Sequence, residues 1–171
     1  MPIIPNFPEN LMTEHMNWHD PNMIGMPGGR QIPQGSAGSG LEFLSFHRQF
    51  LSQFHAWYDN QPFADPAAVA PWPQIPPELQ ALQDPNIPCT SDMAAQQDRI
   101  VTNAPPFASD DELGQYIEVG VHGCMHVAAA EVYGEPDLAS PRTAADSTYF
   151  YQLHGLIDAW WQQWQLAQPA G

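Results

Sequence analysis

The sequence contains no lysine, and its only strongly basic residues are Arg30, Arg48, Arg99 and Arg142. Nineteen acidic residues outweigh these four and give a formal net charge of −15. Nucleic acids and anionic membrane surfaces repel so acidic a chain, so we expect neither as a partner. No apolar run approaches the length that spans a bilayer, and residues 1–5 lack the basic and apolar regions of a signal peptide. The compartment stays unknown: the chain is either cytoplasmic or exported by another route.

Cysteine is also scarce, because the chain has only Cys89 and Cys124. They form either one disulfide in an oxidising compartment or two free thiols, and their spacing does not decide between these alternatives. The 171 residues are 43% apolar and 11% aromatic, which is enough to bury a core and argues against an unfolded chain. We therefore expect residues 1–171 to form a single domain.

Apolar residues recur at helical spacing in several segments of the chain, which predicts four main helices. The predicted helices cover roughly residues 9–19, 41–60, 110–133 and 147–168. Ser109 is a suitable N-cap for the third helix, and Gly134 is a suitable stop. Gly120 and Gly123 inside this helix each cost about 1 kcal/mol of helix propensity. The third helix is therefore expected either as one helix or as two pieces.

Proline, glycine and serine are concentrated between the predicted helices. Residues 20–40 and 61–88 have this composition and are predicted to be loops, with shorter helices near 78–82 and 91–101. No segment shows the alternation of a strand. The predicted fold class is therefore mainly α, with a four-helix bundle core that carries the histidines and long loops rich in proline and glycine.

All seven histidines fall within the predicted helices or at their ends. His122 and His126 are four residues apart, so a helix places both on one face, where two imidazoles can bind one metal ion. His154 on the last helix is the natural third ligand. The first half of the chain repeats the pattern, because His15 and His19 are also four apart and His47 follows 28 residues later, as His154 follows His126.

Other metal sites fit these residues less well. A zinc peptidase needs a glutamate directly after the first histidine of the pair, but Gly123 and Met16 occupy that place. A di-iron bundle needs Glu-x-x-His pairs, and the chain does not show that spacing. A set made of histidines alone favours copper.

The residues around these histidines resemble the copper-binding patterns of tyrosinases, catechol oxidases and molluscan haemocyanins. One family pattern contains Phe-Leu-x-Trp/Phe-His-Arg-x-x-Leu-x-x-x-Glu, and residues 43–55 read FLSFHRQFLSQFH. The other contains Asp-Pro-x-Phe-aromatic-x-x-His-x-x-x-Asp, and residues 147–158 read STYFYQLHGLID. The family's His-x-x-x-His between them matches His122 and His126. The resemblance covers roughly residues 41–60 and 118–165.

The resemblance implies a pair of copper ions, each held by three histidines, that binds dioxygen and oxidises small phenols. We therefore expect two coppers, or one if the first site is degenerate. A copper-delivery protein is a further expected partner. The implied activity is oxidation of o-diphenols, with monophenols as a further class. No catalytic residue beyond the metal ligands is expected, and the alternative is a copper protein without turnover or a haemocyanin-like dioxygen carrier. The expected ligands are His15, His19, His47, His122, His126 and His154.

The sequence departs from the family patterns at several positions. The family's first-set histidine would fall near residues 37–38, where none occurs, and His55 replaces the closing glutamate. Two completions of the first site follow: His15, His19 and His47 together, which we prefer, or one of the first two with His47 and His55. Gly123 replaces an asparagine that in the family helps to orient a phenol-deprotonating water.

Three further charged side chains, those of Arg48, Glu118 and Asp158, lie close in sequence to the predicted ligands. Arg48 and Asp158 are expected to form a helix–helix ion pair or to orient imidazoles. Glu118 is expected either beside the ligands or on the helix surface, and the sequence favours neither.

Overall fold

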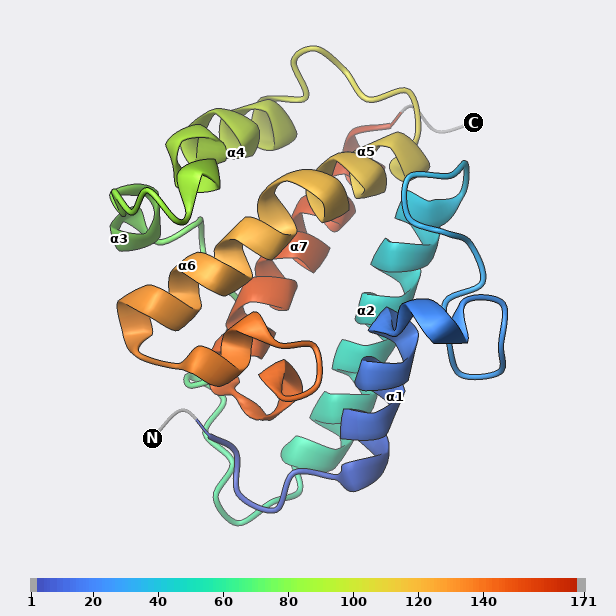
Figure 1. The fold of residues 1–171 in the computed structure, drawn as a ribbon, viewed down its shortest axis with the longest axis vertical. Coiled ribbons are helices and arrows are strands. Elements are labelled where there is room, and N and C mark those ends of the chain that lie inside the picture. The colour runs from blue at the N-terminus through green and yellow to red at the C-terminus, as the bar shows by residue number, and fades with distance from the viewer. Residues whose placement is uncertain (1–2, 169–171) are drawn as a thin grey trace.

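Four helical segments form the core of the protein (Figure 1), which confirms the predicted mainly α class. The computed structural model describes residues 3–168. The core contains α1 (Glu9–His19), α2 (Ser39–Tyr58), α7 (Thr148–Ala167), and a third segment that begins at α5 (Asp110–Tyr116) and ends with α6 (Gly123–Tyr133). Within residues 3–168 there is no strand, and the single β-bridge pairs Ile3 with Ser147.

Short elements fill the long connections. The predicted short helices are present as α3 (Pro77–Gln80) and α4 (Met93–Thr102). The 3-10 turns are η1 (Pro21–Met23), η2 (Pro88–Asp92), η4 (Pro136–Ala139) and η5 (Ala144–Asp146). None of the helices among the described residues is both long enough and apolar enough to cross a membrane.

The buried stripe of α2 explains where the site lies. Its buried residues recur every three or four positions, as expected for one face of a helix. Phe43, Phe50 and Phe54 on this stripe are fully buried. Phe50 and Phe54 pack against Phe150 and Tyr151 of α7, whereas Phe43 faces Trp18 and His122. His47 lies on the same stripe with 3% of its surface exposed. The aromatic core therefore carries this imidazole into the centre of the bundle.

The third helical segment is one continuous helix with a change of winding in its middle. A π-helical stretch, η3 (Ile117–His122), joins α5 to α6. The alternative of two pieces is met in part: the α-helix is divided into α5 and α6, but the chain stays helical through the π-helical stretch, which contains Gly120 and ends just before Gly123. Ser109 caps the start by accepting a hydrogen bond from the Glu112 backbone N–H, and Gly134 ends the helix in the left-handed conformation. π-helical turns are rare and often mark functional sites.

Helices α2 and α5 touch through their backbones. A Cβ atom added at Gly40 would collide with the Asp111 carbonyl oxygen and the Gln115 backbone nitrogen, and one added at Gly114 would collide with Gly40. The Asp111 carboxylate accepts hydrogen bonds from the backbone N–H groups of Gly38, Gly40 and Leu41 at the start of α2. Asp111 therefore caps α2 from another helix, a role that its own position in α5 did not suggest.

A Gly40→Ala change is expected to destabilise the fold, because the new methyl group meets backbone atoms that cannot move aside alone. Overpacking of this kind costs about 1–3 kcal/mol or more. Urea unfolding followed by circular dichroism measures the effect. Gly123→Ala is the matched control, since its added Cβ meets nothing within 4 Å and its φ of −61° is helical. The control should be neutral or gain up to about 1 kcal/mol. Equal stability of both variants would contradict the close contact.

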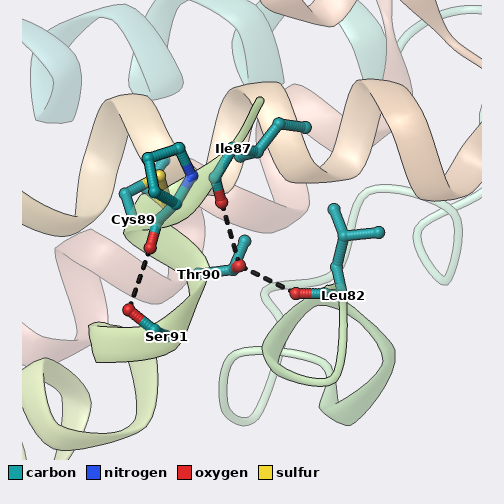
Figure 2. The surroundings of a disulfide bond; sticks show 7 residues. Leu82, Ile87, Cys89, Thr90 and Ser91 are labelled. Carbon is teal, nitrogen blue, oxygen red and sulfur yellow. Dashed lines mark hydrogen bonds between the residues drawn. A yellow bond between two sulfur atoms is a disulfide. The ribbon is translucent and has the colours of Figure 1, made fainter. Parts of the chain in front are cut away.

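The two cysteines form a disulfide, which decides between the alternatives that the sequence left open. Cys89 in η2 is bonded to Cys124 in α6. The surrounding turn is held by the Thr90 hydroxyl, which lies 2.8 Å from the Leu82 carbonyl oxygen, and by the Ser91 hydroxyl, which donates to Pro88 (Figure 2). The bond thus joins the end of the proline-rich connection to α6. Cys124 is two residues from His122 and two residues from His126.

Removing this disulfide in a Cys89→Ala/Cys124→Ala variant is expected to lower the free energy of unfolding. The bridged residues are 35 apart, and the loop-closure relation gives about 3–4 kcal/mol for that length. Thermal and urea unfolding of the variant measure the loss. The native protein under a reducing agent serves as a second route to the same state and should show the same loss. An unchanged unfolding midpoint in both would exclude a stabilising role.

Candidate metal centre

Six of the seven histidines meet in the interior of the helical core. They come from α1 (His15, His19), α2 (His47), the π-helical η3 (His122), α6 (His126) and α7 (His154). The structure therefore brings together all six residues that the sequence predicted as ligands, and their rings contact one another directly.

The first predicted site is assembled as preferred from the sequence. His15, His19 and His47 each offer a ring nitrogen, and these atoms lie within 4.8 Å of one another. The pair on α1 is brought together by the four-residue spacing, with ring centroids 4.6 Å apart. These three imidazoles form a group that could hold a metal ion.

The second site differs from the predicted set in one member. His122 and His154 group with His47, again with ring nitrogens within 4.8 Å, and His126 is outside this group. His126 instead lies against His154, with their Nε2 atoms 3.2 Å apart. His47 therefore belongs to both groups, and its ring stacks on that of His154 at a centroid distance of 4.3 Å.

Backbone carbonyls orient three of the imidazoles. The Nδ1 atom lies 2.9 Å from Pro141 O in His15, from Phe43 O in His47 and from Leu138 O in His126. A carbonyl oxygen only accepts, so Nδ1 carries the proton in each ring, and Nε2 presents its lone pair. This arrangement is the usual way in which a protein prepares histidine for a metal.

Several ring nitrogens in the cluster are buried without a hydrogen-bond partner. These atoms are the Nε2 atoms of His15, His47 and His122 and the Nδ1 atom of His154. A buried polar atom without a partner costs about 1–3 kcal/mol, and most proteins avoid it. Four such atoms in one cluster fit a site whose partners are metal ions.

Burial keeps the six imidazoles uncharged. Burial is the main cause that lowers the pKa of both His15 and His126 to about 4, although in each ring the hydrogen bond to a carbonyl opposes it. Burial also lowers the pKa of the other four well below the usual value, and neighbouring histidines add to the effect. Because a metal binds the neutral form of histidine, the cluster is ready to bind at neutral pH without first releasing protons.

A cavity of about 300 Å³ opens beside the histidines. Four imidazoles line it, those of His15, His19, His122 and His126. The remaining wall is mostly apolar and is formed by Gly123, Val127, Leu138, Ala139, Pro141 and Ala144, with Arg30, Gln34 and Glu118 as the other polar lining residues. A small molecule in this cavity would therefore touch both helices that carry the His-x-x-x-His pairs.

Glu118 lies beside the ligands and not on the helix surface, which decides between its two predicted positions. Its carboxylate is buried and accepts a 2.6 Å hydrogen bond from Arg30 Nη1. The guanidinium also stacks on Trp18 and donates from Nε to the Ile32 carbonyl oxygen. Burial raises the pKa of Glu118, while Arg30 acts in the opposite direction. No pattern in the sequence pointed to Arg30, because its partner Glu118 is 88 residues away.

His55 is outside the cluster. Its side chain is 42% exposed, and its Nδ1 atom lies 3.8 Å from a carboxylate oxygen of Asp59, the C-cap residue of α2. The alternative first site that combined His47 with His55 therefore finds no support. The predicted helix–helix ion pair between Arg48 and Asp158 is confirmed, and Arg48 also covers the ring of Trp161.

Comparisons with known proteins found no match to this chain. The chain matches no protein-family model, no curated protein sequence and no solved structure. The function is therefore inferred from the geometry of the site and from the sequence patterns. What the structure shows of the centre is that buried histidine groups from separate helices could hold a metal ion.

Proposed function

We propose that the protein is a copper-dependent oxidoreductase that oxidises o-diphenols to quinones with dioxygen. The observation that carries this proposal is the convergence of six uncharged imidazoles, with partnerless buried nitrogens, beside a cavity for a small molecule. The similarity of residues 43–55 and 147–158 to the tyrosinase patterns supports the same function.

The donor set favours copper among the metals. Both groups contain imidazole only, and imidazole suits copper, zinc, iron or nickel, whereas magnesium and calcium take oxygen ligands. The one carboxylate that lines the cavity, Glu118, is engaged by Arg30. When bound, a copper pair would supply the redox chemistry by which two electrons pass from a catechol to dioxygen.

The protein itself would bind and orient the substrate. Ligand pockets commonly span about 300–1,000 Å³, so a cavity of about 300 Å³ suits a single aromatic ring. Val127, Leu138 and Pro141 give the cavity apolar surface that such a ring would contact, and four imidazoles line the same cavity. The buried surroundings of His47 and His154 keep bulk water away from the centre.

Gly123 predicts a preference for catechols over monophenols, because it replaces the asparagine that helps to deprotonate phenols in the family. Gly123 lines the cavity, and a Cβ added there meets nothing within 4 Å, so a side chain can start at this position without a clash. A Gly123→Asn variant is expected to raise the rate on a monophenol relative to that on the matching catechol by about 10-fold or more, the lower range for a placed proton acceptor. Oxygen uptake with 4-methylphenol and 4-methylcatechol measures the ratio, with Gly123→Ala as the control. An unchanged ratio would remove Gly123 as the determinant.

The copper-to-protein ratio after reconstitution and desalting is the first test of the proposal. Elemental analysis is expected to give about two coppers per chain, and the loaded protein should convert 4-methylcatechol to its quinone. Two bound coppers without quinone formation at millimolar catechol would reject the enzyme and leave a dioxygen-binding protein. No retained copper would reject the copper centre altogether.

A mononuclear copper protein without turnover is the second candidate, because one observation favours it. His47 belongs to both histidine groups, and one imidazole nitrogen does not ordinarily serve two ions. If His47 stays with the first group, the second keeps three imidazoles only when His126 turns from His154 towards the ion. One copper per chain in the same elemental analysis would select this candidate.

A further inference from the structure

Residues 136–146, which we call the strap, contact both halves of the histidine cluster. The strap consists of η4, η5 and the turn between them. His126 on α6 donates from Nδ1 to the carbonyl oxygen of Leu138, and His15 on α1 donates from Nδ1 to that of Pro141, both at 2.9 Å. Two histidines from different predicted ligand sets are thus oriented by carbonyls only three residues apart.

The strap is held in its conformation by hydrogen bonds that avoid the histidines. The Thr143 hydroxyl donates to the Asp137 carbonyl oxygen at 2.9 Å and closes the strap on itself. The Tyr151 hydroxyl on α7 donates to Ala145 at 2.7 Å, and the Ile4 backbone N–H donates to Asp146 at 2.7 Å. The positions of the two orienting carbonyls therefore depend on contacts that a variant can remove without touching a ligand.

The strap also forms a wall of the cavity. Leu138, Ala139, Pro141 and Ala144 line the space beside His15, His19, His122 and His126. Any change in the strap would therefore reach both imidazole pairs and the substrate space together.

We propose that the strap couples the two metal sites, so that metal at one site strengthens binding at the other. The inference rests on the proposed copper pair. An ion held by His15 fixes the ring and, through its Nδ1–H, the carbonyl of Pro141. That restraint orders the strap and places the Leu138 carbonyl for His126. Coupling of this kind is reciprocal, because linkage requires each ion to strengthen the other by the same factor.

The expected size of the effect follows from similar contacts in other metal sites. Loss of a group that orients a metal-bound histidine typically weakens affinity by about 10–100-fold. Coupling between two sites is typically about 5–150-fold. A loosened strap should weaken binding at both sites within these ranges and leave the number of bound ions unchanged.

The test compares Thr143→Ala with the unsubstituted protein in a copper(II) titration against a chelator of known affinity. Both binding steps are expected to weaken by about 10–100-fold, at an unchanged stoichiometry of two. Thr102→Ala is the matched control, since its hydroxyl also donates to a backbone carbonyl, at 2.7 Å within α4, away from the strap. The control should bind copper like the unsubstituted protein.

A second measurement follows the strap without any enzyme assay. In a His19→Phe variant, which removes a ligand from the first site only, copper at the remaining site should slow hydrogen exchange of the Leu138 and Thr143 amides. Unchanged exchange on copper binding, or a Thr143→Ala protein that binds both ions normally, would overturn the coupling while leaving the copper pair intact. A single copper in the unsubstituted protein would instead contradict the pair itself.

Discussion

A His47→Phe variant should lose the copper of the first site, bind copper more weakly at the second, and oxidise catechol at under about 1% of the native rate. His47 supplies a ring nitrogen within 4.8 Å of the donors of both histidine groups. It is the member that the two groups share, so its replacement affects both of them. Removing even an orienting partner of a ligand costs about 10–100-fold, and removing a ligand itself should cost more. The second site is affected because the His47 ring stacks on that of His154. Copper content by elemental analysis and oxygen uptake with 4-methylcatechol measure the two losses.

His55→Phe is the matched control on the same helix. His55 lies eight residues further along α2 and is 42% exposed, so this substitution should leave copper content and activity unchanged. Phenylalanine in place of His47 faces an aromatic environment that includes Phe43 and Phe46, and far-ultraviolet circular dichroism checks that the helices persist. A His47→Phe protein that still binds two coppers with native affinity would show that His47 is not a ligand.

The metal-free protein should lose stability steeply as the pH falls from about 6.5 to about 4. In the unfolded chain histidine titrates near 6.5, whereas burial lowers the pKa of His15 in the folded protein to about 4. Between these values the unfolded chain binds a proton that the folded protein does not, so acid favours unfolding. Above pH 6.5 His15 is neutral in both the folded and the unfolded state, so it no longer makes the stability depend on pH. His15 alone accounts for about 3 kcal/mol, at 1.36 kcal/mol per pKa unit.

The other five cluster histidines shift in the same direction, and a domain of this size is stable by only about 5–15 kcal/mol. Urea unfolding at a series of pH values measures the fall. The net charge of −15 would have the opposite effect. Acid neutralises carboxylates and relieves their mutual repulsion, which would raise the stability over the same pH range. Copper-loaded protein should show a smaller fall until the pH at which protons displace the metal. A flat or rising stability from pH 6.5 to 4 would contradict buried neutral histidines.

Local signals in the sequence located the helices well. The first predicted helix, residues 9–19, coincides with α1, and Ser109 and Gly134 bound the third as expected. These features depend on nearest neighbours along the chain, such as a side-chain cap or a glycine that accepts positive φ. The π-helical turn was not predicted, because its winding depends on how η3 packs against the rest of the core and on no residue type alone.

The chain by itself determined the mainly α class and the six histidines of the centre, since helical spacing brings His15 to His19 and His122 to His126 whatever surrounds them. Only the tertiary structure decided how these pairs combine. It placed His47 between the two groups, left His55 at the surface, joined Cys89 to Cys124 and buried Glu118 against Arg30. Each of these contacts joins or separates side chains on different elements, so it depends on the angle and register at which the helices pack. Spacing along one chain does not contain that information.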